Sequence, residues 1–493
     1  MNLADLLSGA ASSHTDKTAL IVASSGDRIT FAQLEAEADR VAAGLQALGV
    51  QPGDRVAIGM PNAPHFAYAY FGILRAGAVV LPLNIMLTER ETQAILEDSG
   101  TKVVLCAGAF VEAARAAAGN VDNVEHVVSV DEWDRLKGTK PQRVEREDDE
   151  LAVLAYTSGT TGEPKGVMLS HGNLQANLRQ QMSIPEAHVS SEDVLFLALP
   201  LFHIFGLNVT LGLLAMNGAT GLLVERFEPI PSLRAIAEHK VTVLFGAPTM
   251  YGAWVSVPGA DQYNLSRVRL AISGAAPLPA DVLRDFRDLF GVHIYEGYGL
   301  TETAPTLWSN RMADRPRAGS VGKPLPEVEF RLIDEDDQDV ELGDPGEIVV
   351  KGPNVFLGYW NRPDETERAF VDGWFRTGDI GVLDEEGYLY LVDRKRDLII
   401  VSGFNVFPSE VERALLQNPS VKDAAVVGVP HAYTGEAVKA YVVLDDSDRA
   451  TESELVADVQ SRLARFKCPS SIEIVEELPH LLTGKVLRRA LRT

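Results

Sequence analysis

Cysteine is nearly absent, since the 493 residues hold only Cys106 and Cys468 and no Cys-x-x-Cys pair. This excludes a disulfide framework and argues against a zinc site built on paired cysteines. Positive charge is also scarce, with 45 Lys and Arg against 69 Asp and Glu and a formal net charge of -24. Such an excess of negative charge opposes non-specific binding to nucleic acid or anionic membranes. We therefore expect a cytoplasmic protein without a nucleic-acid partner, in which an anionic ligand would need a local basic site.

Signals for export or membrane insertion are missing as well. The N-terminal stretch MNLADLLSGAASSH has neither a basic start nor a long apolar run, so we expect no signal peptide. One stretch, 194–224, contains no Asp, Glu, Lys or Arg and is long enough to cross a bilayer. Pro200, His203 and Asn208 interrupt it, and its glycines favour a strand, a turn and a buried helix. We expect no transmembrane segment.

The first 320 residues alternate between helical and strand patterns. Thr30 and Gln33 form a capping box ahead of apolar residues at three- and four-residue steps over 31–48, and Gly49 ends this helix. The strand VAIGM follows, then a helix over about 63–76, and then the strands VVLPL and VVLC on either side of the helix TERETQAILED. This alternation is typical of doubly wound α/β sheets. The length predicts two to four packed units.

Beyond about residue 320 the pattern changes to short strands and turns. VEFRLID, GEIVVKG and YLYLVD predict a small β-rich subdomain. Four charged residues, DRKR, follow at 393–396. From 397 onward the chain has its own pattern, with Ser409 and Glu412 as a capping box for VERALLQ and with AAVVGV, KAYVVL and IEIVEEL as strands. These residues can form a small separate α+β domain.

Residues 156–167, YTSGTTGEPKGV, form a loop rich in glycine and small hydroxyls. The P-loop pattern is incomplete here, because Pro164 replaces a glycine and Gly166 follows Lys165 where Ser or Thr would hold magnesium. Proline has no N–H to offer a phosphate oxygen. Two interpretations stay open on these residues alone: an exposed turn, or a loop that wraps a polyphosphate with its hydroxyls and glycine amides.

Further motifs follow in order: LALPLFHIFG, SGAAPL, YEGYGLTET, GWFRTGD, DRKRDLIIVSGFNVFP and LLTGKVLRR. Together with TSGTTGEPKGV they resemble, over nearly the whole chain, the adenylate-forming enzymes: acyl- and aryl-CoA synthetases, adenylation domains of peptide synthetases, and beetle luciferases. The resemblance implies a large N-terminal domain at 1–393, a hinge at 394–396 and a small mobile C-terminal domain at 397–493. It also implies ATP, Mg²⁺ and CoA: a carboxylate attacks the α-phosphorus of ATP and releases pyrophosphate, and a thiol then displaces AMP.

The first step of that reaction needs positive charge rather than a base. The carboxylic acid is already ionised at pH 7 and must approach a polyanion. The resemblance implies that Thr301 touches phosphate, that Glu302 holds magnesium and that Lys485 bridges the carboxylate and the α-phosphate. The alternative for Lys485 is an exposed lysine in a basic tail. The implied ligands of the β- and γ-phosphates are Thr157, Ser158, Gly159, Thr160, Thr161, Gly162 and Lys165.

The resemblance also implies the adenine site. Gly274, Ala275 and Ala276 match the segment that lies against adenine, where small side chains permit close approach. Tyr298, followed by Gly299, matches the residue that stacks on the ring. A tyrosine in an apolar core is the ordinary alternative.

Ribose and thiol contacts are implied nearer the C-terminus. Asp379 matches the carboxylate that accepts the ribose hydroxyls, and Arg394 matches a second ribose or phosphate contact. Taken singly, they would be a turn aspartate and a surface arginine. In the family the C-terminal domain swings after the first step, so that Lys485 leaves and the loop around Gly403 lines a tunnel for CoA. Arg396 matches the hinge, where many relatives carry Lys or Asp.

The resemblance also implies an acyl pocket, which includes Phe202, His203, Met250 and Gly297. A lone histidine in an apolar run is usually a satisfied core residue, whereas the family places an aromatic residue and a histidine beside the reacting carboxylate.

The expected class of acid substrate follows from the absence of charged residues in two segments. The stretches IFGLNVTLGLLAMNGATGLL and FGAPTMYGAW have no Lys, Arg, Asp or Glu to pair with a second charge on a dicarboxylic or amino acid. We expect a fatty acid first and an aryl acid as the alternative, with CoA as acceptor. Loading of a separate carrier protein, a luciferase-like oxygenase and a non-catalytic acyl or nucleotide sensor are the rival functions. A homodimer is left open.

Overall fold

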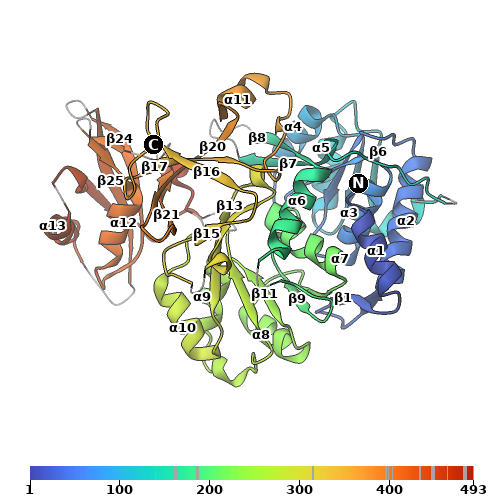
Figure 1. The fold of residues 1–493 in the computed structure, drawn as a ribbon, viewed down its shortest axis with the longest axis horizontal. Helices are drawn as coiled ribbons and strands as arrows, with labels where there is room; N and C mark the ends of the chain where they lie inside the picture. Colours follow the sequence, from blue (N-terminus) through green and yellow to red (C-terminus); the bar gives the residue numbers. More distant parts are fainter. Residues whose placement is uncertain are drawn as a thin grey trace. The chain divides into compact units, whose positions relative to one another are not determined.

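The computed structural model describes residues 1–138, 140–158, 164–184, 188–313, 316–394, 397, 399–401, 404–431, 435–445, 450–463, 465–480 and 486–491. The chain forms two compact units. Unit 1 comprises Met1–Glu329 and Lys351–Gly373, and unit 2 comprises Phe330–Val350 and Trp374–Thr493. Figure 1 shows both as mixed helices and strands, which confirms the expected α/β fold with a small β-rich part and a small C-terminal part. The boundary expected at 394–396 stays a prediction.

Unit 1 contains a seven-stranded sheet in the order β18-β8-β7-β4-β3-β5-β6. The strands from β7 to β6 run parallel, whereas β8 is antiparallel to both β7 and β18. The bounds are β3 (Arg55–Gly59), β4 (Val79–Pro82), β5 (Val103–Cys106), β6 (His126–Ser129), β7 (Leu151–Ser158), β8 (Pro164–Ser170) and β18 (Gly358–Tyr359).

A second sheet of unit 1 has nine strands in the order β15-β14-β13-β12-β11-β9-β10-β1-β2. The six strands from β13 to β1 in this order are parallel. At the edges, β2 is antiparallel to β1, β14 is antiparallel to β13, and β15 is antiparallel to β14. The bounds are β1 (Thr18–Val22), β2 (Arg28–Thr30), β9 (Val194–Leu197), β10 (Thr220–Leu223), β11 (Val243–Gly246), β12 (Leu270–Ser273), β13 (Ile294–Gly299), β14 (Thr306–Ser309) and β15 (Lys323–Pro324).

The helices of unit 1 begin and end largely where local signals predict. Thr30 and Gln33 form the expected capping box of α2, and Gly49 follows its end with φ +84°. The helices are α1 (Asp5–Ser13), α2 (Phe31–Ala47), α3 (Pro64–Arg75), α4 (Glu89–Ser99), α5 (Phe110–Ala118), α6 (His171–Met182), α7 (Leu213–Asn217), α8 (Pro229–Glu238), α9 (Pro248–Val255), α10 (Ala280–Phe290) and α11 (Pro363–Arg368).

The uncharged stretch 194–224 contains the expected strand, turn and buried helical segment, and a second strand, β10, follows them. The helical segment is a π-helix over Phe205–Gly212 that continues into α7. Within the described residues, no helix has the length and apolar character that crossing a membrane requires.

Unit 2 contains β16 (Glu329–Ile333), β17 (Gly346–Lys351), β20 (Trp374–Leu383) and β21 (Leu389–Arg394). A further sheet in the order β23-β22-β25-β24, with β26 beside β25, packs with α12 (Pro408–Leu416) and α13 (Glu452–Arg462) around one apolar core. Its strands are β22 (Ile399–Val401), β23 (Phe404–Val406), β24 (Val421–His431), β25 (Gly435–Leu444) and β26 (Ser471–Ile474).

One expected cap is wrong. Helix α12 starts after Phe407 with Pro408 at its first position, so Ser409 and Glu412 lie inside the helix. Ser409 Oγ instead donates to the backbone oxygen of Val392, and Glu412 accepts hydrogen bonds from Val426 N and from Arg488. Partners distant in the sequence therefore replaced the local cap.

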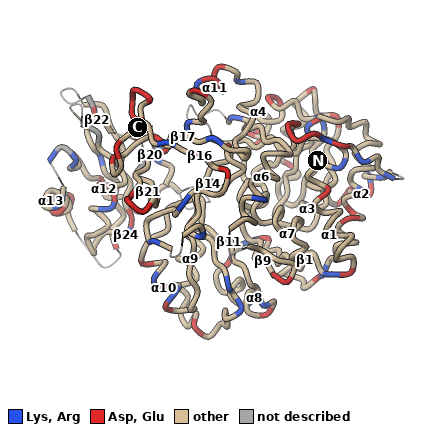
Figure 2. The backbone as a smooth tube through the Cα atoms, in the orientation of Figure 1, with Lys and Arg blue, Asp and Glu red and all other residues tan. Residues whose placement is uncertain are grey.

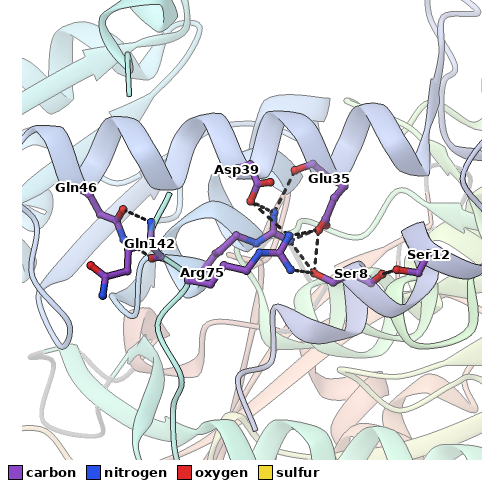
Figure 3. A network of polar contacts seen from close by, with 8 residues as sticks. Ser8, Ser12, Glu35, Asp39, Gln46, Arg75 and Gln142 are labelled. Atoms are coloured by element: carbon purple, nitrogen blue, oxygen red, sulfur yellow. Dashed lines mark hydrogen bonds and ion pairs between the residues drawn. The ribbon is translucent and has the colours of Figure 1, made fainter. Parts of the chain in front are cut away.

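A buried arginine ties α1, α2 and α3 together (Figure 3). Arg75, 2% exposed, forms ion pairs with Glu35 at 2.6 Å and Asp39 at 2.7 Å, and its guanidinium also donates to Ser8 Oγ at 3.1 Å. Arg143 reaches the same Glu35 at 2.6 Å but is half exposed. The buried arginine should therefore matter more to stability than the exposed one.

We expect Arg75→Met to lower the free energy of unfolding of unit 1 by about 2–4 kcal/mol, because it removes the buried cation and leaves Glu35 and Asp39 only the half-exposed Arg143. Arg143→Met, the matched control, should lower it by less than about 1 kcal/mol, because its charge stays largely in water. Urea unfolding followed by near-UV circular dichroism measures both. Equal losses in the two variants would contradict the assigned role of burial.

Candidate active site

The described residues of the stretch 156–167 belong to two antiparallel strands, β7 and β8. In β7 and β8, Thr157 lies opposite Lys165 and Ser158 lies opposite Pro164. The expected phosphate ligands Gly159, Thr160, Thr161 and Gly162 lie outside the described residues, and for Ser158 only the backbone is described. A P-loop joins a strand to a helix, so the hairpin explains why the P-loop pattern is incomplete.

Lys165 is the cation expected at this hairpin. Its ammonium forms an ion pair with Glu365 of α11 and lies 5.5 Å from the centre of the Tyr359 ring. The side chain is 16% exposed. Acidic residues are spread over segments of both units (Figure 2), so a polyphosphate at this hairpin would depend on local cations such as Lys165.

Thr301 and Glu302 lie in η4 (Thr301–Thr303), a short turn directly after β13. The Tyr359 hydroxyl donates to Glu302 Oε1 at 2.9 Å, and Phe356 N donates to the backbone oxygen of Glu302 at 2.9 Å. Burial, followed by the nearby Glu302, raises the pKa of the Tyr359 hydroxyl, so it stays a donor at neutral pH. Tyr359 thus brings together two residues expected at the triphosphate, Lys165 and Glu302.

The chemistry of these donors fits magnesium bound together with a nucleotide. Among the described residues, no cluster of three or more His, Cys, Asp or Glu side chains could hold a metal ion. Glu302 offers carboxylate oxygens and Thr301 a hydroxyl beside it. Magnesium in nucleotide enzymes typically uses one or two carboxylates together with the substrate's phosphates and water.

Uncharged amides on α6 and at Asn354, ahead of β18, hold the η4 turn and the start of β14 in place. Asn177 Nδ2 donates to the backbone oxygen of Thr306 at 2.7 Å, and Asn354 Nδ2 donates to those of Thr303 at 2.8 Å and Thr306 at 3.2 Å. Gln180 Nε2 reaches Asn354 Oδ1 at 3.2 Å. Sequence reasoning missed these residues. The run NLQANLRQQ on α6 contains several amides that are buried in the structure, and this pattern could have indicated Asn177 and Gln180.

The expected adenine residues lie at the carboxyl end of neighbouring strands. Gly274, Ala275 and Ala276 follow β12, and Ala275 takes a left-handed backbone conformation with φ 73°. A Cβ added to Gly274 would meet the Phe205 ring at 3.0 Å, so the backbone is closely packed there. Crevices at the carboxyl ends of parallel strands are the usual ligand sites of such sheets.

Tyr298 on β13 is buried, and its ring centre lies 5.9 Å from that of Trp308 on the paired strand β14. Gly299 has no room for a side chain, because a Cβ would lie 1.8 Å from the backbone oxygen of Pro305. At Gly297 a Cβ would meet Trp308 O at 3.3 Å. The role of Tyr298 as a stacking partner for adenine stays a prediction.

Glu296, which sequence reasoning did not select, lies in β13 opposite Ser273, the last residue of β12. It is 7% exposed, and its Oε1 accepts a hydrogen bond of 3.0 Å from Leu278 N, at the far end of the segment that begins at Gly274. Burial raises the pKa of Glu296 to about 7, although the bond from Leu278 N favours the ionised form. Glu296 therefore anchors the segment that carries the expected adenine residues.

A buried amide holds the segment that leads to His203. Asn62, 6% exposed, donates to the backbone oxygen of Leu199 at 2.9 Å and accepts from Leu201 N at 2.9 Å. His203 Nδ1 accepts from Phe205 N at 3.3 Å, so the proton of the neutral ring is on Nε2. Burial lowers the pKa of His203, which favours this neutral form.

The remaining acyl-pocket residues lie in apolar surroundings. Phe202 is half-buried, and Met250 is buried on α9, where its sulfur accepts from Ala247 N at 3.5 Å. Phe205 and Phe245 are also buried, with ring centres 6.4 Å apart in a T-shaped contact.

In unit 2, Asp379 and Arg394 lie opposite each other in the antiparallel pair β20 and β21. Asp379 is 6% exposed, and its N donates to Thr377 Oγ1 at 3.2 Å. For Arg394 only the backbone is described, and Arg396, Gly403 and Lys485 lie outside the described residues. The pairing brings the two expected ribose contacts to one strand end of this hairpin.

Comparisons with known proteins cover both units. Residues 7–360 match the family model described as AMP-binding enzyme, and residues 410–485 match the AMP-binding enzyme C-terminal domain. A long-chain-fatty-acid–CoA ligase of Escherichia coli is 38% identical over 535 residues, covering 100% of this chain and 94% of the relative. A feruloyl-CoA synthase of an Amycolatopsis species is 39% identical over 469 residues, covering 95% of this chain and 94% of the relative.

Two solved structures share the fold over the whole chain. ATP-bound MatB from Rhodopseudomonas palustris has a TM-score of 0.92 and 37% identity, covering 100% of this chain and 98% of its own. A benzoate CoA ligase from Burkholderia xenovorans has a TM-score of 0.90 and 29% identity, covering 100% of both chains.

The raised pKa of Glu296 predicts a pH dependence of stability. Between its ordinary pKa of 4.5 and about 7, the folded protein binds a proton that the unfolded chain has lost, so the free energy of unfolding falls as pH rises through this window. The full loss is on the order of 3 kcal/mol. We expect Glu296→Gln, which stays neutral, to melt close to wild type at pH 5 and above it at pH 8.

Differential scanning calorimetry across this pH range measures the effect. Glu329→Gln, which changes an exposed glutamate on β16, is the matched control and should follow the wild-type profile. An unchanged pH profile for Glu296→Gln would show that Glu296 is not held neutral in the folded protein.

Proposed function

Because the chain belongs to the AMP-binding family of adenylate-forming enzymes and is an AMP-forming acyl-CoA synthetase, we propose that it activates an apolar monocarboxylic acid, in the first place a fatty acid. The carboxylate oxygen attacks the α-phosphorus of ATP, and pyrophosphate leaves. The CoA sulfur then attacks the acyl carbonyl, AMP leaves, and the thiol proton passes to solvent. An aryl acid is the second candidate substrate.

The observation that carries the substrate class is the absence of charged residues from the two segments expected to supply the acyl pocket. The segments 204–223 and 245–254 contain no Lys, Arg, Asp or Glu, and Phe205, Phe245 and Met250 within them are buried. A second carboxylate or an ammonium group on the acid would be buried there without a partner. The names of two relatives support the two candidates, a long-chain-fatty-acid–CoA ligase and a feruloyl-CoA synthase.

Residues of unit 1 would prepare the first step. Lys165 and the hydroxyls and amides of the 157–162 loop would bind the β- and γ-phosphates, and Thr301 and Glu302 would hold Mg²⁺. Magnesium, when bound, offsets the charge of the triphosphate and orients it for in-line attack. Neutral His203, a donor through Nε2, would position the carboxylate without pairing with it as a cation.

Residues near the C-terminus would complete the site. Asp379 and Arg394 would hold the ribose, and Lys485 would stand between the carboxylate and the α-phosphate. Gly403 would line the path of CoA once the part beyond the hinge at 394–396 has moved. A domain of residues 397–493 and a cytoplasmic location stay predictions.

The decisive experiment is pyrophosphate release from ATP and Mg²⁺ across fatty, aryl, dicarboxylic and amino acids, each with and without CoA. Turnover that needs CoA and is fastest with fatty acids is the expected result, because only an uncharged chain suits an uncharged pocket. Fastest turnover with aryl acids would select the second candidate. Release of about one equivalent regardless of CoA would indicate a carrier-protein acceptor, and no release with any acid would contradict an enzymatic function.

Lys485→Ala should slow pyrophosphate release by roughly 10²-fold or more, because a positive charge that the first transition state needs is removed. Thioester formation from supplied acyl-adenylate should change much less, since Lys485 would be absent from that step. Single-turnover assays of the two half-reactions measure the contrast. Equal losses in both would refute the role given to Lys485.

A further inference from the structure

Tyr359 touches two groups expected at the triphosphate, although it belongs to neither motif. Its hydroxyl donates to Glu302 Oε1 at 2.9 Å, and its ring centre lies 5.5 Å from the Lys165 ammonium. Lys165 and Glu302 are 137 positions apart in the sequence. One side chain therefore fixes the geometry between an expected phosphate ligand and an expected metal ligand.

The backbone of Tyr359 is held on both sides. In β18 it pairs with Val167 of β8, and the next residue, Trp360, donates its N–H to the backbone oxygen of Gly166 at 2.8 Å. The N–H of Tyr359 itself donates to Thr366 Oγ1 at 2.9 Å. These hydrogen bonds fix the backbone of Tyr359 beside β8, the strand that carries Lys165.

A third residue, Glu365, balances the charge of Lys165. Glu365, on α11 only six residues after Tyr359, forms the ion pair with Lys165. A partly buried ammonium needs such an anion, and an arriving phosphate would take its place. The Tyr359 ring is neutral, so it can keep its contact with the ammonium whether the ammonium pairs with Glu365 or with a phosphate.

We propose that Tyr359 is a positioning residue that holds the Glu302 carboxylate and the Lys165 ammonium at a fixed separation for a magnesium–triphosphate ligand. The inference rests on the proposed function. A hydroxyl that donates to a carboxylate makes a charge-assisted hydrogen bond, and this bond selects one orientation of Glu302. Without it, the carboxylate must be ordered when the metal binds, and affinity falls.

Binding of Mn²⁺, a paramagnetic substitute for Mg²⁺, tests the proposal without turnover. In the presence of α,β-methylene-ATP, electron paramagnetic resonance reports the dissociation constant of bound Mn²⁺. We expect Tyr359→Phe, which keeps the ring and loses only the hydroxyl, to raise that constant about 10-fold, as for one lost hydrogen bond to a charged group. The matched control is Tyr390→Phe, which removes a hydroxyl that donates to Asp384 Oδ2 at 3.3 Å and leaves Glu302 untouched. It should bind Mn²⁺ like wild type.

A double-mutant cycle shows whether Tyr359 acts through Glu302. In a Glu302→Gln background, Tyr359→Phe should cause no further loss of Mn²⁺ affinity, whereas a general loss of structure would lower affinity in both backgrounds. An unchanged dissociation constant in Tyr359→Phe, or equal losses in both backgrounds, would overturn the inference.

The wild-type protein separates this inference from the proposed function. Wild type that releases pyrophosphate and binds Mn²⁺ with the analogue, combined with a normal Tyr359→Phe, refutes only the positioning role. Wild type that neither binds the metal–nucleotide pair nor releases pyrophosphate refutes the proposed function, and the positioning role falls with it.

Discussion

A two-residue strand, β18, pairs with β8 and carries Tyr359 to a position between Lys165 and Glu302. The relative position of Lys165 and Glu302 depends on this pairing, because the hairpin that carries Lys165 and the turn that carries Glu302 are far apart in the sequence. Backbone hydrogen bonds fix the strand, and the aromatic side chain spans the remaining distance. A rigid side chain with only two rotatable bonds loses little conformational entropy in doing so.

The polar groups that support the site are mostly neutral. Asn62, Asn177 and Asn354 hold the segments around His203 and η4 through backbone oxygens and N–H groups. An amide can donate and accept inside the protein without the desolvation penalty of a charge. It also adds no charge that would compete with the triphosphate. The ionic cluster around Arg75 instead joins the helices α1, α2 and α3.

Charged side chains are therefore distributed according to the ligand group expected at each segment. The chain carries a net charge of -24, the segments 204–223 and 245–254 expected at the acyl group contain no charged residue, and Lys165 lies where a polyphosphate is expected. Opposing requirements meet within one unit: a polyanion needs cations, whereas an alkyl or aryl chain needs their absence. The uncharged π-helix after His203 and the charged hairpin at Lys165 meet these requirements on separate elements.

The sequence by itself determined the doubly wound pattern, the α2 cap at Thr30 and Gln33, the uncharged acyl segments and the motifs of the family, because each is encoded within a few neighbouring residues. Only the tertiary structure decided that Ser409 donates to Val392 instead of capping α12, that Glu296 anchors the segment after β12, and that Tyr359 lies between Lys165 and Glu302. Such contacts join residues from 17 to 194 positions apart in the chain. No local pattern encodes them, since packing and strand pairing choose which side chains meet.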